Sequence, residues 1–222
     1  MKKFCFFVGL IICCFGFVGC SSNKNFQNRI SEKDEILLSQ EDDNFFVTLC
    51  IGKRENPYIV DGKNGEMIDF AVLTAYGKTE KVQNGEAKFK INVNGIEKNG
   101  IFEVNPFDGS FVVDLLNVGN EIQQAQLVIE VASNSYSYKL TSALSEGCIS
   151  ADEALAIAEK EFKKVEKQLT NDDKNSFEVY VRLMQNPGQI PLFYVSAINE
   201  EDQLFALIID PTTKEVIAKN FK

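Results

Sequence analysis

Hydrophobic and polar side chains alternate with a period of two from about residue 44 to residue 144. Because neighbouring residues in a β-strand point to opposite faces, this alternation predicts half-buried strands. The clearest runs contain Phe89, Ile91 and Val93, then Leu127, Ile129 and Val131, then Tyr136, Tyr138 and Leu140. Asn-Gly and Asp-Gly dipeptides separate such runs and favour tight hairpins. About seven short strands at this spacing, with no helical stretch, predict an all-β sandwich over residues 45–147.

The periodicity changes to that of a helix at Ser150. Ser150 and Glu153 form a capping-box pattern, which marks the start of a helix over residues 151–169. Its apolar side chains recur at helical spacing and are expected to face a sheet: Ala154, Ile157, Ala158, Phe162, Val165 and Leu169. Strands are predicted at 177–184, 192–198, 204–209 and 216–218.

These patterns together predict a chain of two domains. The second, residues 148–222, would be an α+β domain with one helix packed on an antiparallel sheet of three or four strands. Residues 145–149 would form the hinge between the two domains.

The first 19 residues have the layout of an export signal. Lys2 and Lys3 give a positive start, an apolar stretch follows, and Gly19 stands just before Cys20. The alternative is an uncleaved transmembrane anchor, for which Phe4 to Gly19 is short compared with the usual span of about 20 residues. We therefore interpret residues 1–19 as a signal peptide.

Phe17-Val18-Gly19-Cys20 resembles the lipobox of bacterial lipoproteins, with Phe17 in place of the usual Leu. The resemblance implies that Cys20 receives a diacylglycerol group on sulfur and becomes the first residue after cleavage. The protein would then be anchored in the bilayer through its lipid, on the extracytoplasmic side of the cell membrane.

Residues 20–44 are polar, lack sustained periodicity and end in the acidic run Glu41-Asp42-Asp43. This composition predicts a tether, which as a random coil would span about 27 Å. We interpret the acidic run as a solvated spacer rather than a calcium site, because the EF-hand pattern is missing.

The charge and composition of the chain exclude several classes of partner and catalytic site. The chain carries a net charge of −9, which becomes −11 once the two signal lysines are removed. Such a charge argues against a nucleic-acid partner and against broad electrostatic adhesion to an anionic bilayer. The chain has no histidine, so His-dependent nucleophiles and His-ligated zinc are excluded. No catalytic residue, metal site or cofactor is predicted, and we expect a protein that is not an enzyme.

Two cysteines, Cys50 and Cys148, remain outside the signal and the lipobox. An exported location permits a disulfide between them. The alternative is two separate buried thiols, because a free cysteine packs as a small hydrophobic residue.

Two further resemblances concern the predicted domains. Val93-Asn94-Gly95, Asp108-Gly109-Ser110-Phe111 and Val118-Gly119-Asn120 resemble turns of bacterial immunoglobulin-like domains, a family of spacers at the cell surface. Ile149-Ser150-Ala151-Asp152-Glu153-Ala154 and Ile208-Ile209-Asp210, followed by Glu215-Val216, resemble the PepSY domain. That family includes propeptides of exported peptidases, and its usual Thr-Gly at the final turn is here Thr213-Lys214. Neither resemblance transfers a catalytic residue.

Three aromatic residues on neighbouring predicted strands are the candidates for partner binding: Phe193, Tyr194 and Phe205. Adjacent strand residues face opposite sides, so at least one must point away from the helix. The alternative is a set of core aromatics with a tyrosine at the rim. Asp210 follows four apolar residues, and we interpret it as a turn former rather than a calcium ligand.

The hypothesis favoured by these observations is a cell-envelope lipoprotein that binds a protein partner and regulates or inhibits an exported peptidase. One alternative is a carboxylate-dependent cell-wall hydrolase, which needs two close carboxylates in a cleft. Another is a structural or solute-binding lipoprotein.

Overall fold

The computed structural model describes residues 26–59, 65–83, 85–115, 118, 122–165, 169–170 and 177–221. The predicted signal peptide and Cys20 lie outside these residues. Within them, none of the helices combines the length and the hydrophobicity needed to cross a bilayer.

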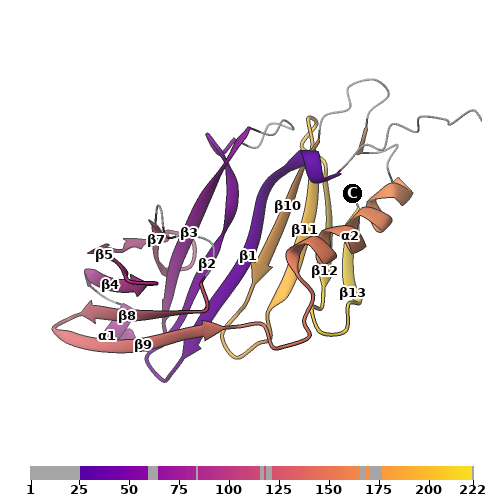
Figure 1. The fold of residues 1–222 in the computed structure, drawn as a ribbon. Helices are drawn as coiled ribbons and strands as arrows, with labels where there is room; N and C mark the ends of the chain where they lie inside the picture. The colour runs from indigo at the N-terminus through magenta and orange to yellow at the C-terminus, as the bar shows by residue number, and fades with distance from the viewer. Residues whose placement is uncertain are drawn as a thin grey trace, which may run out of the picture.

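A single 13-stranded sheet runs through the described residues (Figure 1). Its strands are β1 (Ile30–Glu41), β2 (Phe45–Asn56), β3 (Glu66–Gly77), β4 (Ala87–Val93), β5 (Ile96–Ile101), β6 (Glu103–Val104), β7 (Phe111–Leu115), β8 (Gln124–Val131), β9 (Asn134–Ser142), β10 (Phe177–Met184), β11 (Leu192–Asn199), β12 (Leu204–Ile209) and β13 (Val216–Phe221). The helical segments are η1 (Phe26–Arg29), α1 (Glu80–Gln83), α2 (Ala151–Phe162) and η2 (Lys163–Val165).

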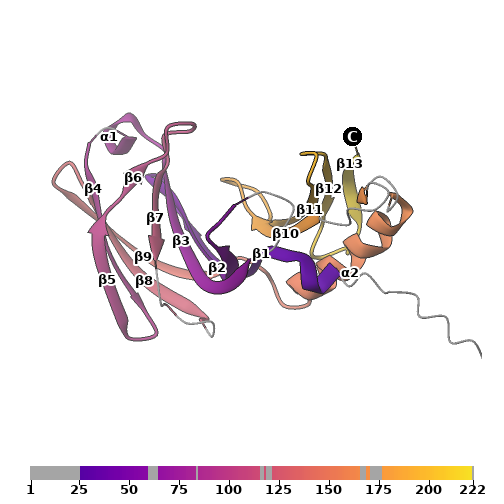
Figure 2. The same ribbon diagram turned by 90° about the horizontal axis from the view of Figure 1, so that it is seen from above.

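The main path of the sheet has the order β13-β12-β11-β10-β1-β2-β3-β7-β6. A branch leaves β1 through β9 to β8, β4 and β5. Its strand pairs are antiparallel except β1 with β10, which are parallel. The N-terminal half of the sheet curls on itself, whereas α2 covers one face of β10–β13 (Figure 2).

The expected division into an immunoglobulin-like sandwich followed by a separate α+β domain is wrong. Residues 30–41, which we expected to belong to a tether, form β1, and this strand pairs with β2, β9 and β10. It therefore joins both halves of the chain into one sheet. Two consecutive residues of β1 are buried on opposite faces of the strand: Leu37 lies in the core under α2, and Leu38 lies in the core of the curled half.

The strand β1 was not predicted from the sequence because its composition is polar. Its register shifts between Ile30 and Glu32 against β10, and between Asp34 and Ile36 against β2. Each irregularity interrupts the alternation of hydrophobic and polar positions that marks a strand. Ser31 and Asp34 are also buried, so burial in β1 does not follow hydrophobicity.

The predicted strands of the curled half are confirmed individually. β4 pairs with β8, and β8 pairs with β9, so that their apolar positions face one core. The turn between β4 and β5 uses Asn94 and Gly95, both with positive φ (50° and 82°). This conformation is the one that a two-residue Asn-Gly hairpin requires.

The capping box and the buried face of the helix are also confirmed. The Ser150 side chain accepts a hydrogen bond from the Glu153 backbone N–H, and the Glu153 carboxylate accepts one from the Ser150 N–H. Ala154, Ala158 and Phe162 are buried against the sheet, together with Leu155, whereas Ile157 and Val165 are only partly buried. The α-helix ends at Phe162 and continues as η2, so it is shorter than predicted.

The connection at residues 145–149, which we expected to be a hinge, lies against the rest of the protein. The Ile149 N–H donates to the carbonyl of Pro211 at 2.9 Å, and the Ile149 side chain is buried. Just before it, the Ala143 N–H donates to the carbonyl of Leu37 at 2.8 Å.

Candidate functional site

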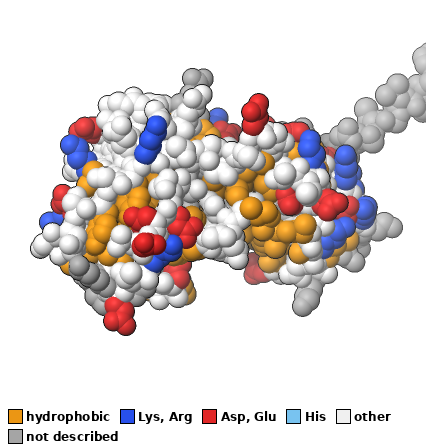
Figure 3. Space-filling view, turned by 90° about the horizontal axis from the view of Figure 1, so that it is seen from below, with side chains coloured by type: hydrophobic (Ala, Val, Ile, Leu, Met, Phe, Trp, Pro, Cys, Tyr) orange, Lys and Arg blue, Asp and Glu red, His pale blue; other side chains and the backbone are white. Residues whose placement is uncertain are grey.

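The face of β10–β12 opposite α2 is the candidate site. On β11, Phe193, Val195 and Ala197 point into the core under α2, and the residues between them point to the other side. We call that other side the open face and define it by its exposed or half-exposed large side chains: Tyr58, Arg182, Met184, Leu192, Tyr194 and Ile208. Figure 3, which shows the molecule from below, has hydrophobic side chains at the surface of both halves, with a large group on the half that contains these strands.

The three aromatic residues singled out from the sequence are divided between the two faces. Phe193 and Phe205 are each 1% exposed and belong to the core under α2. Tyr194 is half-buried and lies on the open face. The expectation that at least one of the three points away from the helix is confirmed, and only Tyr194 of this set can contact a partner without unfolding.

A row of side chains crosses the open face at the position of Tyr194. Arg182 on β10 is the register partner of Tyr194 on β11, and Tyr194 is the register partner of Ile208 on β12. Met184 and Leu192 form the adjacent pair of the β10–β11 ladder. Tyrosine, arginine and methionine are enriched in protein–protein interfaces, and tyrosine and arginine often dominate their binding energy.

Arg182 is held in one orientation by two neighbours. Its Nε and Nη2 atoms each donate to the Glu32 carboxylate at 3.0 Å, and Nη2 also donates to the Tyr58 hydroxyl at 2.5 Å. The Tyr58 hydroxyl donates in turn to Glu32 at 2.5 Å. Burial alone would lower the pKa of Arg182, but the Glu32 carboxylate outweighs it and the pKa is raised. Burial and Glu32 likewise raise the pKa of Tyr58 to about 12.

Buried polar side chains lie beside these exposed groups on the same face of β10. The Tyr58 ring meets the Tyr180 ring edge-on at 6.3 Å, and the Arg182 guanidinium lies 5.4 Å from the Tyr180 ring centre. Tyr180 is buried and its hydroxyl donates to the buried Glu178 carboxylate. Burial first, and then this hydrogen bond, raise the pKa of Tyr180. The exposed Tyr58 and Arg182 therefore pack against a side chain, Tyr180, that is itself held by its hydrogen bond to Glu178.

Asp34 lies where β1 and β10 separate. Their ladder ends at Lys33 and Val181, and the Asp34 carboxylate then accepts the Leu183 N–H at 2.8 Å. Asp34 is buried, and this burial, with the nearby Glu32 carboxylate, raises its pKa to about 7. The Cys50 thiol faces the same carboxylate, and burial raises the thiol pKa well above its usual range.

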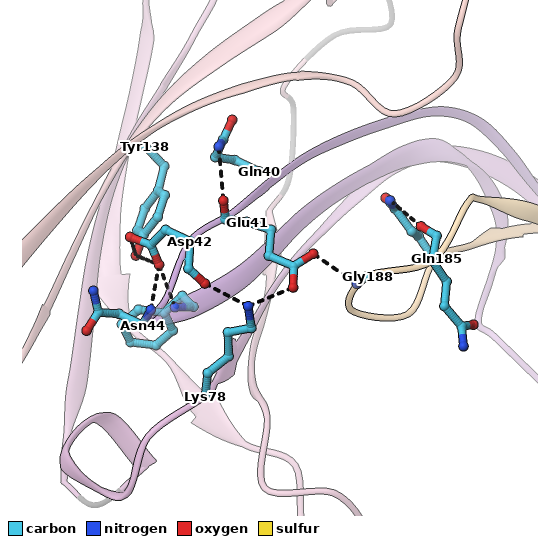
Figure 4. Close-up of polar contacts among 10 residues, drawn as sticks. Gln40, Glu41, Asp42, Asn44, Lys78, Tyr138, Gln185 and Gly188 are labelled. Carbon is cyan, nitrogen blue, oxygen red and sulfur yellow. Dashed lines mark hydrogen bonds and ion pairs between the residues drawn. The ribbon is translucent and has the colours of Figure 1, made fainter.

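A second polar junction joins the two halves at the β1–β2 turn (Figure 4). The Glu41 carboxylate binds Lys78 Nζ at 2.7 Å and accepts the Gly188 N–H, from the β10–β11 turn, at 2.9 Å. The Asp42 carboxylate accepts the N–H groups of Asn44 and Phe45, both at 2.8 Å. The acidic run that we interpreted as a solvated spacer thus builds a turn and a contact between strands.

The two cysteines that we considered as a disulfide are both free thiols. Cys50 packs against the core under α2 beside Asp34, on β2. The sulfur of Cys148 lies 3.3 Å from the Ser145 hydroxyl and 3.6 Å from the Thr212 hydroxyl. The alternative of two separate thiols is the arrangement found, although both Cys50 and Cys148 are only partly buried.

Asp210 is a turn former, as we interpreted it. Its carboxylate accepts the N–H groups of Thr212 at 2.7 Å and Thr213 at 3.1 Å. Lys214 follows with a φ of 65°, in the position where the PepSY resemblance has glycine. The lysine therefore adopts the left-handed conformation that the turn requires.

The hydrolase hypothesis needs two carboxylates in one cleft. A hollow of about 530 Å³ over β4, β8 and β9 has Glu97 as its one carboxylate, with Lys90 and Lys139 beside it. A second hollow, of about 350 Å³ beside β5, contains Glu130 as its one carboxylate. Neither hollow supplies the pair that this chemistry requires. Among the described residues, no cluster of three or more acidic or cysteine side chains is arranged to hold a metal ion.

Sequence reasoning missed Tyr58, Glu32 and Arg182 as members of one site. Arg182 carried a signal, because Glu178, Tyr180 and Arg182 alternate with apolar residues in Phe177–Met184. Glu32 lay in the predicted tether, and Tyr58 lies in the connection after β2.

In comparisons with known proteins, the chain matches no family model, no curated protein and no solved structure.

Proposed function

We propose that this chain is a lipid-anchored protein of the cell envelope that binds a protein partner through its open face. The observation that carries the binding proposal is the row of Arg182, Tyr194 and Ile208, flanked by Tyr58 and by Met184. This row combines side chains typical of binding hot spots with a rigid support.

The open face has the physical properties that such a site needs. The charge of Arg182 is already neutralised by Glu32, so a partner would not have to bury Arg182 as an unpaired charge. Because Glu32 and Tyr58 fix Arg182, little side-chain entropy would be lost on binding.

The anchor proposal rests on the sequence from Phe17 to Cys20, and the partner class on the PepSY resemblance. An exported peptidase is the partner that this resemblance favours, and binding at the open face would regulate or inhibit it. Envelope localisation follows from the same lipobox.

The test replaces Tyr194 with a photo-crosslinking amino acid and identifies the adducts formed in intact cells. We expect one dominant protein adduct, which Arg182→Ala reduces. Phe107 supplies the control position, since it is an aromatic residue that is 96% exposed on the β6–β7 connection. Crosslinks that form equally from Phe107 and Tyr194, or from Phe107 alone, would contradict the assignment of the open face.

A further inference from the structure

A group of basic side chains lies at the C-terminal end of α2, beside the first described residue. We call it the basic patch and define it as Arg29, Lys160, Lys163, Lys164 and Lys219. The Phe26 ring stacks on Phe162 at 6.0 Å, which brings η1 against the end of α2. Figure 3 shows basic side chains around acidic ones at this end of the C-terminal half.

Contacts among η1, α2, η2, β10 and β13 hold the patch together. Lys219 on β13 binds the Glu161 carboxylate of α2 at 2.6 Å, and Lys164 binds the same carboxylate at 2.7 Å. The Arg29 guanidinium lies 4.3 Å from the ring centre of Phe177, whose ring in turn contacts Phe26 at 5.2 Å.

The charge of the patch is opposite to that of the chain. Among the described residues, three of its five basic groups, Lys163, Lys164 and Lys219, pair with two carboxylates, Glu159 and Glu161, whereas the whole chain has a net charge of −9. The side chains of Lys163, Lys164 and Lys219 are 54%, 65% and 44% exposed, so their ammonium groups can reach a second surface.

The position of the patch along the chain identifies that surface. Phe26 follows the predicted lipid-bearing Cys20 by six residues. Even a fully extended segment of this length reaches only about 20 Å, so the patch must lie close to a bilayer that holds the lipid.

We propose that the basic patch faces the anionic bilayer and binds its phosphate headgroups, which orients the protein on the membrane. The inference rests on the proposed lipid anchor for the placement of the patch. Each lysine near an anionic surface strengthens binding about fivefold, so three of them contribute a factor on the order of 100. The acidic remainder of the chain is repelled by the same surface, which favours one orientation.

The test is lysine acetylation of the lipidated protein reconstituted in vesicles, read by mass spectrometry. Vesicles of phosphatidylcholine alone are compared with vesicles that also contain phosphatidylglycerol. We expect the four lysines of the patch to be labelled more slowly when phosphatidylglycerol is present. Lys88, Lys90 and Lys139, on β4 and β9, are internal controls whose labelling should not change.

Matched variants separate charge from position. The substitutions Lys160→Gln, Lys163→Gln and Lys164→Gln together should abolish the protection of Lys219. The same three changes at Lys88, Lys90 and Lys139 should leave that protection intact. The control set suits the purpose because Lys88 and Lys90 also pair with carboxylates on the surface, at 3.4 and 3.5 Å.

The experiment distinguishes an error in the inference about the basic patch from an error in the proposed lipid anchor. The mass of the N-terminal peptide reports the lipid on Cys20 independently of lysine labelling. A lipidated protein whose patch lysines are equally accessible in both vesicles overturns the inference and leaves the anchor standing. If Cys20 carries no lipid, the same protein is added to preformed phosphatidylglycerol vesicles: protection of the patch still supports headgroup binding, and no protection overturns it.

Discussion

Asp34→Asn should stabilise the protein at neutral and alkaline pH. The carboxylate is buried between β1, β2 and β10, and burial is the largest cause of its raised pKa. Glu32 raises the pKa further, whereas the Leu183 N–H, the Cys50 thiol and Arg182 lower it. An asparagine would keep an oxygen for the Leu183 N–H and would remove the charge.

The magnitude follows from the difference in pKa between the folded and unfolded states. The pKa of Asp34 moves from 3.8 to about 7 on folding, so the folded state binds the proton more tightly. The free energy of unfolding therefore falls as the pH rises from about 4 to about 7, because Asp34 loses its proton in the unfolded state while the folded state still binds it. Above pH 7 this loss of stability stays constant. At 1.36 kcal/mol for each pKa unit, the cost of the ionised carboxylate at pH 8 is about 4 kcal/mol.

The assay is urea unfolding of the wild-type chain and the Asp34→Asn variant at pH 4.5, 6 and 8. The two should differ little at the lowest pH, and the variant should gain up to about 4 kcal/mol at the highest. Asp114→Asn is the control, because Asp114 is an exposed carboxylate paired with Arg54, and its loss should cost no more than about 1 kcal/mol. If Asp34→Asn is less stable than wild type at pH 8, attraction to the Leu183 N–H and Arg182 outweighs burial and the reasoning is refuted.

Four further changes test the fold and the anchor. Phe162→Ala removes a fully buried ring and should cost about 3–5 kcal/mol in urea melts, whereas the exposed Lys160→Ala should be nearly silent; equal stability of the two would contradict the packing of α2. Ser150→Ala loses the N-cap and should cost about 1 kcal/mol in the same melts, less than Phe162→Ala. Lys214→Gly relieves a left-handed backbone conformation and should raise the free energy of unfolding by about 1 kcal/mol, and a loss would show that the lysine side chain matters more. Cys20→Ala should abolish metabolic labelling with fatty acid, and undiminished labelling would disprove the lipid anchor.

The elements that could be predicted are those whose burial follows hydrophobicity. In β4, Ala87, Phe89 and Ile91 are buried and the lysines between them are exposed, so the period of two is visible in the sequence. The helix α2 could be predicted equally well, because its capping box and its apolar residues at helical spacing indicate the same segment.

The architecture could not be predicted because it depends on β1. This strand buries Ser31 and Asp34, contains two irregularities of register, and finds its partners across long stretches of chain. A polar strand of this kind resembles a linker until its neighbours are known.

Only part of the candidate site could be predicted from the sequence, because its contacts also join residues that are far apart in the chain. Tyr194 could be found from strand alternation within one segment. Its neighbours could not, since Arg182 meets Glu32 from 150 residues away and Tyr58 from 124 residues away. Contacts of such separation leave no local pattern in the sequence.

The central place of β1 also sets the order in which the chain can fold as it emerges. The strand can pair with β2 almost at once, and β9 later covers Leu38 and Ser39 on its other edge, but the part of that edge from Ile30 to Lys33 stays open until β10 has been made. Until then Asp34 and Glu32 have no Leu183 or Arg182 to bind. Long-range pairing of this kind is slow to form and leaves a strand edge exposed to wrong partners in the meantime. Completion of the sheet is therefore tied to delivery of the last quarter of the chain, and a product truncated before β10 would carry β1 with its edge from Ile30 to Lys33 unpaired.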